Sequence, residues 1–208
     1  MIITVDREFG SGGRELGKRL SDALKMPCYD DEIIEIIAKE CGLDVNYVAH
    51  MSENRIQMAY PLTVGRRLSI PSEVVQQSIK VEIAQNKLFE RLSQQGDCVI
   101  VGRCADVTLA HLHPFRIFVY ADRASKIARC QERAPEQENL PPAQLERKMR
   151  SIDRNRAKQH KMASNIPWGA KEGYEVCINT TDREIKSLIP ALAEYVKNWF
   201  LHTQIAVG

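Results

Sequence analysis

Four small residues at positions 10–13, Gly-Ser-Gly-Gly, lie between two stretches of different character. Residues 2–5 are a β-branched, mostly apolar run that is typical of a buried strand. Leu16, Leu20 and Leu24 are four residues apart, as on one face of a helix. A glycine-rich turn from a strand into a helix points several N–H groups at one place, and the helix adds partial positive charge, which together suit a phosphate group. The alternative is a glycine-rich turn that binds nothing. The candidate phosphate-binding residues are Gly10, Ser11, Gly12, Gly13, Arg14 and Glu15.

The glycine-rich loop departs from the standard nucleotide phosphate-binding loop. That motif reads GxxxxGK[ST], and its lysine reaches the outer phosphates while its hydroxyl group holds Mg²⁺. Counted from the strand, Arg7 stands at the first glycine, Gly13 at the lysine and Arg14 at the hydroxyl residue. Because arginine can bind phosphate through two parallel hydrogen bonds, we expect Arg14 to supply the missing charge. The candidates for holding a metal ion are Ser11 and Glu15.

A basic stretch at residues 147–161, RKMRSIDRNRAKQHK, is a second candidate for chemistry. Phosphoryl transfer requires positive charge around the transferred group and little covalent chemistry from the protein. Asp153 and Arg156 are three residues apart and share a helix face, so the carboxylate can hold the guanidinium in position. The ordinary alternative is a solvated helix with surface ion pairs. The candidate catalytic residues are Arg150, Asp153, Arg154 and Arg156.

A further arginine, Arg103, follows the buried apolar run at residues 98–101. Ligands of parallel sheets bind at the carboxyl ends of the strands, so Arg103 is well placed to hold a phosphate group. The alternative is a solvent-exposed loop arginine. Three more arginines that could reach an acceptor phosphate lie in a segment without clear periodicity: Arg55, Arg66 and Arg67.

The elements that must position these residues alternate between strand and helix. Apolar runs predict strands at residues 2–5, 98–101, 115–120 and 174–178, and a weak strand near Pro27. Helical spacing and capping residues predict helices at 31–41, 72–94, 122–133 and 182–200, among others. This alternation indicates an α/β fold with a central five-stranded parallel sheet covered by helices on both faces. We expect one domain over residues 1–208, with a helical insert at 43–95 on the acceptor side and a lid at 134–165.

The composition is that of an ordinary globular protein, with 208 residues, 44% hydrophobic, 27% charged and a net charge of +2. This charge is too small to indicate nucleic-acid binding. The six cysteines form neither a CxxC pair nor a zinc pattern, so we expect buried thiols in a reducing compartment. No secretory signal is evident, and no segment approaches the roughly 20 apolar residues that span a bilayer. We expect a soluble, cytoplasmic protein with no nucleic-acid or membrane partner.

Three segments together resemble the cytidylate kinase family, and more narrowly its cytidylate-kinase-like branch. They are REFGSGGRE at 7–15, VIVGRCADV at 99–107 and DRNRA at 153–157, and the likeness extends in order over most of residues 1–182. The resemblance implies the P-loop fold of nucleoside monophosphate kinases, with ATP and Mg²⁺ as cofactors and small-molecule nucleotides as substrates. CMP or dCMP is the acceptor that it favours.

The resemblance also implies roles for single residues. Arg103 matches an arginine that contacts the acceptor nucleotide in the family. The family has an aspartate next, where this chain has Cys104, and Asp106 would substitute for it. Asp30 corresponds to the start of the acceptor-binding region. The residues that match the lid, which closes over the transferred group, are Asp153, Arg154 and Arg156, with Arg150 one residue from the usual position of an earlier arginine.

Several functions fit these observations. The first is an ATP-dependent kinase that phosphorylates a nucleoside monophosphate. A variant is a kinase that acts on another small molecule. A function of a different class, a nucleotide-binding regulatory module without turnover, is favoured by the absent lysine and the absent hydroxyl group of the loop.

Overall fold

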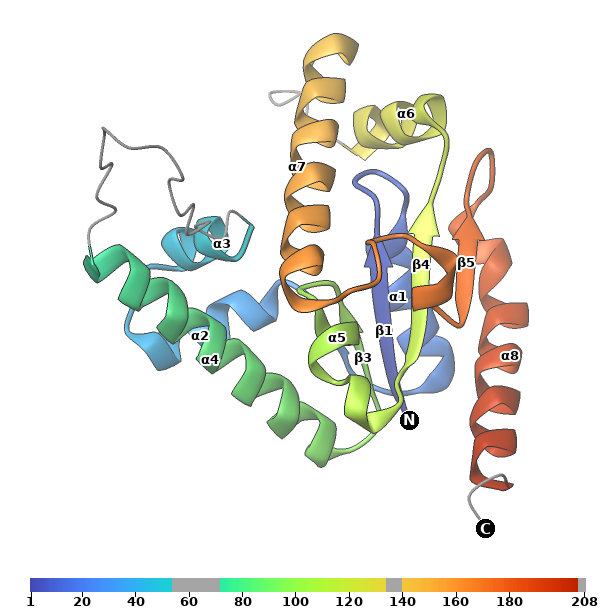
Figure 1. The fold of residues 1–208 in the computed structure, drawn as a ribbon. Helices are drawn as coiled ribbons and strands as arrows, with labels where there is room; N and C mark the ends of the chain where they lie inside the picture. The colour runs from blue at the N-terminus through green and yellow to red at the C-terminus, as the bar shows by residue number, and fades with distance from the viewer. Residues whose placement is uncertain (54–71, 134–139, 206–208) are drawn as a thin grey trace. The chain divides into compact units, whose positions relative to one another are not determined.

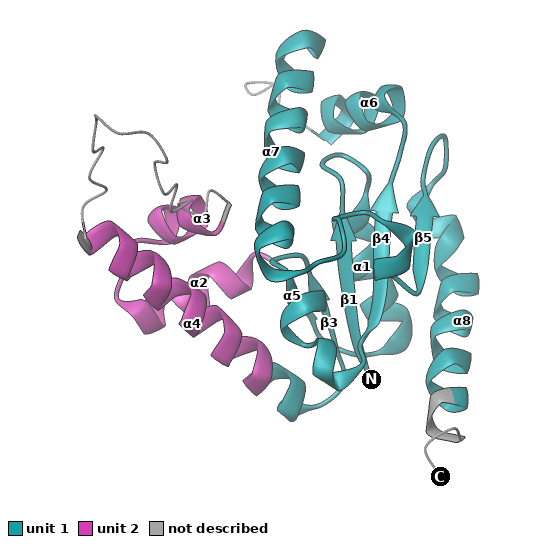
Figure 2. Cartoon of the chain, in the orientation of Figure 1, with its two compact units in different colours: residues 1–30, 92–208 teal, residues 31–91 magenta. Residues whose placement is uncertain are grey.

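The structure, a computed structural model, describes residues 1–53, 72–133 and 140–205 (Figure 1). The chain divides into two compact units (Figure 2). The larger unit comprises residues 1–30 and 92–208, and the smaller unit comprises residues 31–91. None of the helices in the described part of the chain is long and apolar enough to cross a membrane.

A five-stranded parallel sheet forms the centre of the larger unit, in the order β2-β3-β1-β4-β5. This arrangement confirms the predicted fold class, including the weak strand after Pro27. Strand β1 is central, because Val5 pairs with Val101 on one side and with Ile117 on the other. The strands are β1 (Ile2–Arg7), β2 (Cys28–Tyr29), β3 (Cys98–Val101), β4 (Phe115–Tyr120) and β5 (Val176–Asn179).

Helices cover the sheet and connect its strands (Figure 1). The α-helices of the larger unit are α1 (Gly13–Leu24), α5 (Ala105–Thr108), α6 (Arg123–Arg133), α7 (Pro142–Ala163) and α8 (Ile185–Ile205). Two short 3-10 helices are η1 (Ala110–Leu112) and η3 (Lys171–Gly173).

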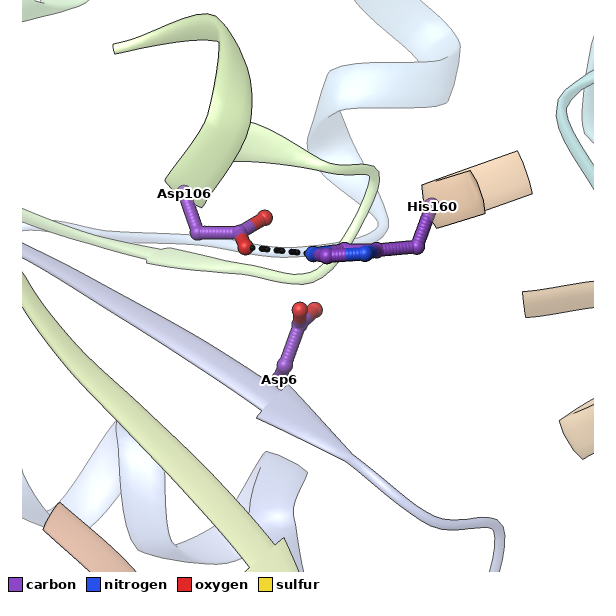
Figure 3. Close-up of side chains that lie close together, drawn as sticks. All are labelled: Asp6, Asp106 and His160. Atoms are coloured by element: carbon purple, nitrogen blue, oxygen red, sulfur yellow. Dashed lines mark hydrogen bonds and ion pairs between the residues drawn. The ribbon is translucent and has the colours of Figure 1, made fainter. Parts of the chain in front are cut away.

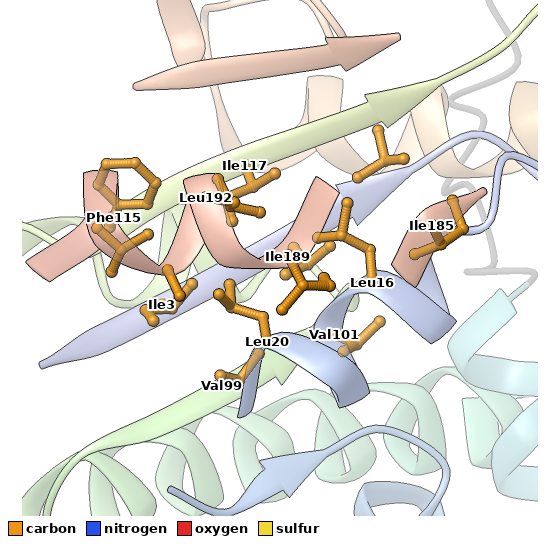
Figure 4. Close-up of a cluster of buried hydrophobic side chains, with 14 of the residues drawn as sticks. Ile3, Leu16, Leu20, Val99, Val101, Phe115, Ile117, Ile185, Ile189 and Leu192 are labelled. Carbon is orange, nitrogen blue, oxygen red and sulfur yellow. The ribbon is translucent and has the colours of Figure 1, made fainter. Parts of the chain in front are cut away.

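The main hydrophobic core lies where α1 and α8 pack against the sheet (Figure 4). Leu16 and Leu20, which the helical spacing placed on one face, are fully buried. Gly17 allows a close approach, since a Cβ atom there would lie 2.8 Å from a methyl carbon of Val101. These contacts fix the start of α1, and therefore the glycine-rich loop, against the carboxyl end of β1.

The smaller unit is helical. It contains α2 (Glu32–Cys41), α3 (Val45–Glu53) and most of α4 (Ser72–Gln95). The side chain of Asp44 accepts a hydrogen bond of 3.0 Å from the N–H of Tyr47 at the start of α3. The predicted insert at 43–95 overlaps this unit, but its limits stay a prediction. The arginines predicted to reach an acceptor phosphate, Arg55, Arg66 and Arg67, lie outside the described residues.

Two strand ends differ from the prediction, and both differences bear on the site. Strand β1 continues past Val5, because Asp6 and Arg7 keep their pairing with β4. Strand β5 starts at Val176 and not at Tyr174, whose hydroxyl group instead donates a hydrogen bond of 3.1 Å to Asp6.

Candidate functional site

The glycine-rich loop runs from the end of β1 to the start of α1. Gly10 and Gly12 have positive φ angles of 79° and 85°, which glycine adopts without steric cost. Gly12 is the N-terminal cap of α1, so the loop delivers the first N–H groups of a helix to the carboxyl edge of the sheet. Those N–H groups have no partner within the helix and are suited to bind an anion.

Side chains from distant parts of the chain donate hydrogen bonds to carbonyl oxygens of this loop. Arg129 on α6 donates hydrogen bonds to the carbonyl oxygens of Gly10, at 2.9 Å, and Thr180, at 3.1 Å. The hydroxyl group of Thr180 donates to the carbonyl oxygen of Ser11 at 2.7 Å. These donors engage the carbonyl oxygens of Gly10 and Ser11 and hold the loop in place. The N–H groups of Glu8, Phe9 and Ser11 are themselves hydrogen-bonded, so the N–H groups suited to an anion are those at the start of α1.

A cavity of about 480 Å³ lies in front of the loop, within the larger unit. Its lining combines the loop with residues of α6 and α7 and is strongly cationic. The one acidic lining side chain, Glu8, is already paired with Lys126 at 2.9 Å. The basic side chains that line the cavity are Arg7, Arg14, Arg129, Arg133, Lys148 and Arg156. A cavity with this charge is suited to a polyanion such as a nucleotide polyphosphate.

Arg7 and Gly13 exchange the roles that the standard loop gives to these two positions. The side chain of Arg7 fills the space beside Gly13, where an added Cβ atom would lie 2.3 Å from the Arg7 Cβ. A lysine at position 13 therefore cannot coexist with Arg7 in this arrangement. Only 11% of the Arg7 side chain is exposed, and the residue lines the cavity. The cation that lies beside the loop thus comes from the end of β1, whereas in the standard motif it comes from the start of the helix.

Arg14, which sequence analysis proposed as the replacement for the lysine, occupies a different environment. Its side chain is 61% exposed and its Nε lies 2.5 Å from a carboxylate oxygen of Asp30. Asp30 also pairs with Arg7 at 3.5 Å. Arg14 does line the cavity, but its guanidinium is held by Asp30 at the rim. Sequence analysis missed Arg7, and the signal available was its place at the first glycine of the motif.

Helix α7 brings two of the four predicted catalytic residues to the loop. Asp153 accepts a hydrogen bond of 2.7 Å from the N–H of Phe9, and Arg156 donates one of 2.8 Å to the carbonyl oxygen of Arg7. Arg150 and Arg154 are exposed on α7 and are not among the residues that line the cavity. Arg150 instead pairs with Glu146, one helical turn away.

The surroundings of Arg156 in the cavity change the pKa of its guanidinium. Burial, followed by the nearby charge of Arg7, lowers the pKa of Arg156 to about 10, and Arg103 acts in the same direction. Asp153 lies 3.7 Å away and opposes this effect, although burial raises its own pKa above the ordinary value. A group of arginines that destabilise one another is relieved by an anion, so this arrangement favours phosphate binding.

The two residues predicted to hold a metal ion are both engaged in the structure. Ser11 is fully buried, and its hydroxyl group donates a hydrogen bond of 2.8 Å to the carbonyl oxygen of Glu8. Glu15 is paired with Arg19 and Arg133. Burial raises the pKa of Glu15, but these two arginines hold it below its ordinary value. The loop therefore does not present the hydroxyl ligand that the standard motif provides for Mg²⁺.

The loop after β3 has an unusual backbone. Gly102, Arg103 and Cys104 have consecutive positive φ angles of 73°, 62° and 56°. Non-glycine residues rarely adopt this region, and strain of this kind concentrates at functional sites. A Cβ atom on Gly102 would lie 1.5 Å from a terminal nitrogen of Arg7, so this loop and the glycine-rich loop meet at the Arg7 guanidinium.

Asp106, predicted to contact an acceptor, lies in a buried cluster with Asp6 and His160 (Figure 3). It is 5% exposed, and one of its oxygens lies 3.0 Å from His160 Nε2. Burial, followed by the charge of Asp106, raises the pKa of Asp6 to about 7. Although burial lowers the pKa of His160, the hydrogen bond and charge of Asp106 raise it above the ordinary value. Sequence analysis missed His160, which stands inside the basic stretch.

Comparison with known proteins agrees with the fold. A protein of unknown function from Eubacterium ventriosum superposes with a TM-score of 0.69 at 21% identity, covering 95% of this chain and 98% of that one. Shikimate kinase from Bacteroides thetaiotaomicron gives 0.56 at 12% identity, with 95% and 98% covered. Deoxyadenosine kinase from M. mycoides with bound dATP gives 0.52 at 9% identity, with 95% and 100% covered. No curated protein matches the sequence.

The sheet order and the glycine-rich loop between β1 and α1 define a protein with the fold of the P-loop kinases. Within that class, the profile of the cytidylate kinase-like family matches residues 2–182. The chain therefore belongs to the cytidylate kinase-like family, as the three sequence segments predicted.

Proposed function

We propose that this protein is a kinase that transfers the γ-phosphoryl group of ATP to a nucleoside monophosphate, with CMP or dCMP as the favoured acceptor. The observation that carries the proposal is the cationic cavity of about 480 Å³ in front of the glycine-rich loop. Membership of the cytidylate kinase-like family supports a kinase that acts on a nucleotide or another small molecule. The particular acceptor rests on the family resemblance alone.

The donor phosphates would lie against the start of α1. In this proposal the N–H groups that follow Gly12 bind phosphate oxygens, while Arg7 and Arg156 surround the group to be transferred. Because these side chains are held before substrate arrives, they stabilise charge in the transition state without the cost of reorganising water. Asp153 keeps α7 on the loop through its contact with the Phe9 N–H. A phosphate acceptor is already ionised at neutral pH, so no general base is required.

The acceptor residues in this proposal are Arg103 and Asp30. Arg103 lies close enough to Arg156 to affect the pKa of that residue, so an acceptor phosphate bound there would be near the donor group. Asp30 pairs with Arg7 and with Arg14, which both line the cavity. Asp106 is buried and turned toward His160, so we assign the acceptor to Arg103 and Asp30 only.

Magnesium fits the cavity only as an ion that arrives with the nucleotide. Mg²⁺ keeps several of its waters and binds phosphate oxygens readily. Ser11 and Glu15 are engaged by other groups, so the chain would hold the ion through the nucleotide and not through a loop hydroxyl. When bound, the ion neutralises part of the phosphate charge.

The first experiment is an assay of ADP release with ATP and Mg²⁺, tested with CMP, dCMP, UMP, AMP, GMP and small-molecule acceptors. ADP release that depends on CMP or dCMP supports the proposal. Release with a different acceptor retains the kinase and changes its substrate. Calorimetric ATP binding without turnover on any acceptor favours the regulatory module, to which the engaged Ser11 and Glu15 also point.

A reciprocal exchange tests the role of Arg7. Arg7→Gly should weaken ATP binding by about tenfold or more, because it removes a charge-assisted contact. Gly13→Lys alone should be poorly tolerated, since its Cβ atom meets that of Arg7. The double variant Arg7→Gly with Gly13→Lys restores the standard arrangement and should recover much of the ATP affinity, measured by calorimetry. A double variant that binds ATP no better than Arg7→Gly would contradict the exchange.

A further inference from the structure

Asp6, Asp106 and His160 form a cluster that the nucleotide site does not use. They come from the end of β1, from α5 and from the last turn of α7, and Figure 3 shows their side chains directed toward one another. Their exposed fractions are 7%, 5% and 3%. One ligand atom from each lies within 4.8 Å of the other two. None of the three lines the cavity in front of the glycine-rich loop.

Hydrogen bonds do not satisfy every polar atom of the cluster. Asp106 Oδ2 faces His160 Nε2 at 3.0 Å, but Asp106 Oδ1 is buried and has no hydrogen-bond partner within the part of the chain that is described. A buried carboxylate oxygen without a partner is costly, and native structures rarely keep one without a water molecule or an ion nearby. Two carboxylates close together in this environment also repel each other.

We propose that Asp6, Asp106 and His160 bind one divalent transition-metal ion, separate from the ion that accompanies a nucleotide. An imidazole nitrogen with carboxylate oxygens is a donor set suited to Mn²⁺, Fe²⁺ or Zn²⁺, whereas Mg²⁺ prefers oxygen ligands alone. The ion would neutralise the two carboxylates and engage Asp106 Oδ1, the oxygen that otherwise has no partner.

The distances between the ligand atoms of the three side chains permit a metal ion to bind after a small adjustment. Two ligands at about 2.2 Å from a metal ion can lie at most about 4.4 Å apart. The Asp106–His160 pair at 3.0 Å meets that limit, and the 4.8 Å span of the cluster requires only a slight inward movement. The hydroxyl group of Tyr174 donates to Asp6 Oδ2 at 3.1 Å, which orients that carboxylate in the way that outer hydrogen bonds orient metal ligands.

The test uses Mn²⁺ alone, without nucleotide, so its result is independent of whether the protein is a kinase. Mn²⁺ is chosen because the six free cysteines bind soft metals such as Zn²⁺ and would obscure the count. After removal of metals with a chelator, Mn²⁺ titration followed by electron paramagnetic resonance should show one bound ion per chain. Asp106→Asn and His160→Gln should each weaken binding by more than about tenfold.

The controls carry the same chemical changes at exposed positions. Asp22→Asn on α1 and His202→Gln on α8 should bind Mn²⁺ as the unaltered protein does. Because a cluster variant could fail to fold, the unaltered protein is also examined by NMR, where Mn²⁺ should broaden the ring signals of His160 before those of His202. Absence of binding, equal binding in the cluster variants, or His160 signals that persist would each overturn the proposal.

Discussion

The guanidinium of Arg7 sits between two loops, and its position depends on a glycine in the other loop. Gly102→Ala would place a Cβ atom 1.5 Å from a terminal nitrogen of Arg7, which must then move away. We expect ATP affinity to fall by about tenfold, measured by calorimetry, because the cation is displaced from the cavity.

Gly42 provides the matched control for this variant. It has a similar φ angle of 64°, but a Cβ atom there meets no atom within 4 Å. Gly42→Ala should cost about 1–2 kcal/mol of unfolding free energy for the left-handed backbone, close to the cost of Gly102→Ala, while leaving ATP affinity unchanged. Equal ATP affinities in the two variants would show that Arg7 does not contribute to ATP binding.

Arg156 should act on turnover more than on binding. Arg156→Ala removes a partly buried guanidinium from the cavity. If it surrounds the transferred group as we propose, kcat should fall by about 10²–10³ with a smaller change in KM, measured in the ADP-release assay. Lys158→Ala, an exposed cation on the same helix, serves as the control and should leave kcat within about twofold. A parallel loss in both variants would indicate a general effect of helix charge.

The interactions of single residues were harder to predict from the sequence than the strands and helices in which those residues lie. Arg7 could be read from the sequence only as a departure from a motif, because the role that we propose for it depends on the space that Gly13 leaves for its side chain. His160 gives no local signal, since its partner Asp106 is 54 residues away in the chain. Arg129 looks like an ordinary helix residue until the fold brings it to the carbonyl oxygens of Gly10 and Thr180.

Helix α7, which lies within the lid predicted at residues 134–165, contacts the glycine-rich loop through Asp153 and the N–H of Phe9. Asp153→Ala leaves that N–H without its charged acceptor, which should cost about 1–3 kcal/mol of unfolding free energy. Hydrogen exchange should become faster for the amides of residues 8–12. Asp22→Ala, an exposed change on α1, should leave both measurements as they are; unaltered exchange in the Asp153 variant would show that α7 does not hold the loop.

Elements with continuous apolar runs were predicted closely. The strands at 98–101 and 115–120 match β3 and β4, because β3 is buried at every residue and β4 at four of its six, so apolar residues mark most of each strand. The end of β1 was predicted two residues early, since Asp6 and Arg7 are polar and keep strand geometry only through pairing with β4. Tertiary contacts of this kind are not visible in a local pattern.

For the whole molecule, the stability of the larger unit rests on the packing of α8 against the sheet. Phe115 at the start of β4 is fully buried and meets Trp199 edge-on, with ring centroids 5.2 Å apart. Phe115→Ala should lower the free energy of unfolding by about 3–5 kcal/mol, measured by chemical denaturation. Leu201→Ala, at a side chain that is 61% exposed on α8, should change it by less than about 0.5 kcal/mol. Similar losses of unfolding free energy in the two variants would show that the packing around Phe115 does not dominate the stability of this unit.

Both sites that we propose lie within the larger unit, which spans residues 1–30 and 92–208. One helix, α7, contributes Asp153 and Arg156 to the first site and His160 to the second. The metal proposal and the kinase proposal can therefore be tested separately on one chain, although a single element supports them.

The exchange between Arg7 and Gly13 constrains how such a loop can evolve. Starting from a glycine–lysine loop, an arginine at position 7 collides with the existing side chain at position 13, whereas loss of the lysine first leaves a loop without its cation. If Arg7 supplies the cation as we propose, each single mutation is expected to be unfavourable and the pair to be tolerated, which is the genetic definition of reciprocal sign epistasis. Lineages with either arrangement are expected to keep it. A search for the glycine–lysine signature alone would overlook proteins that have arginine and glycine at these two positions.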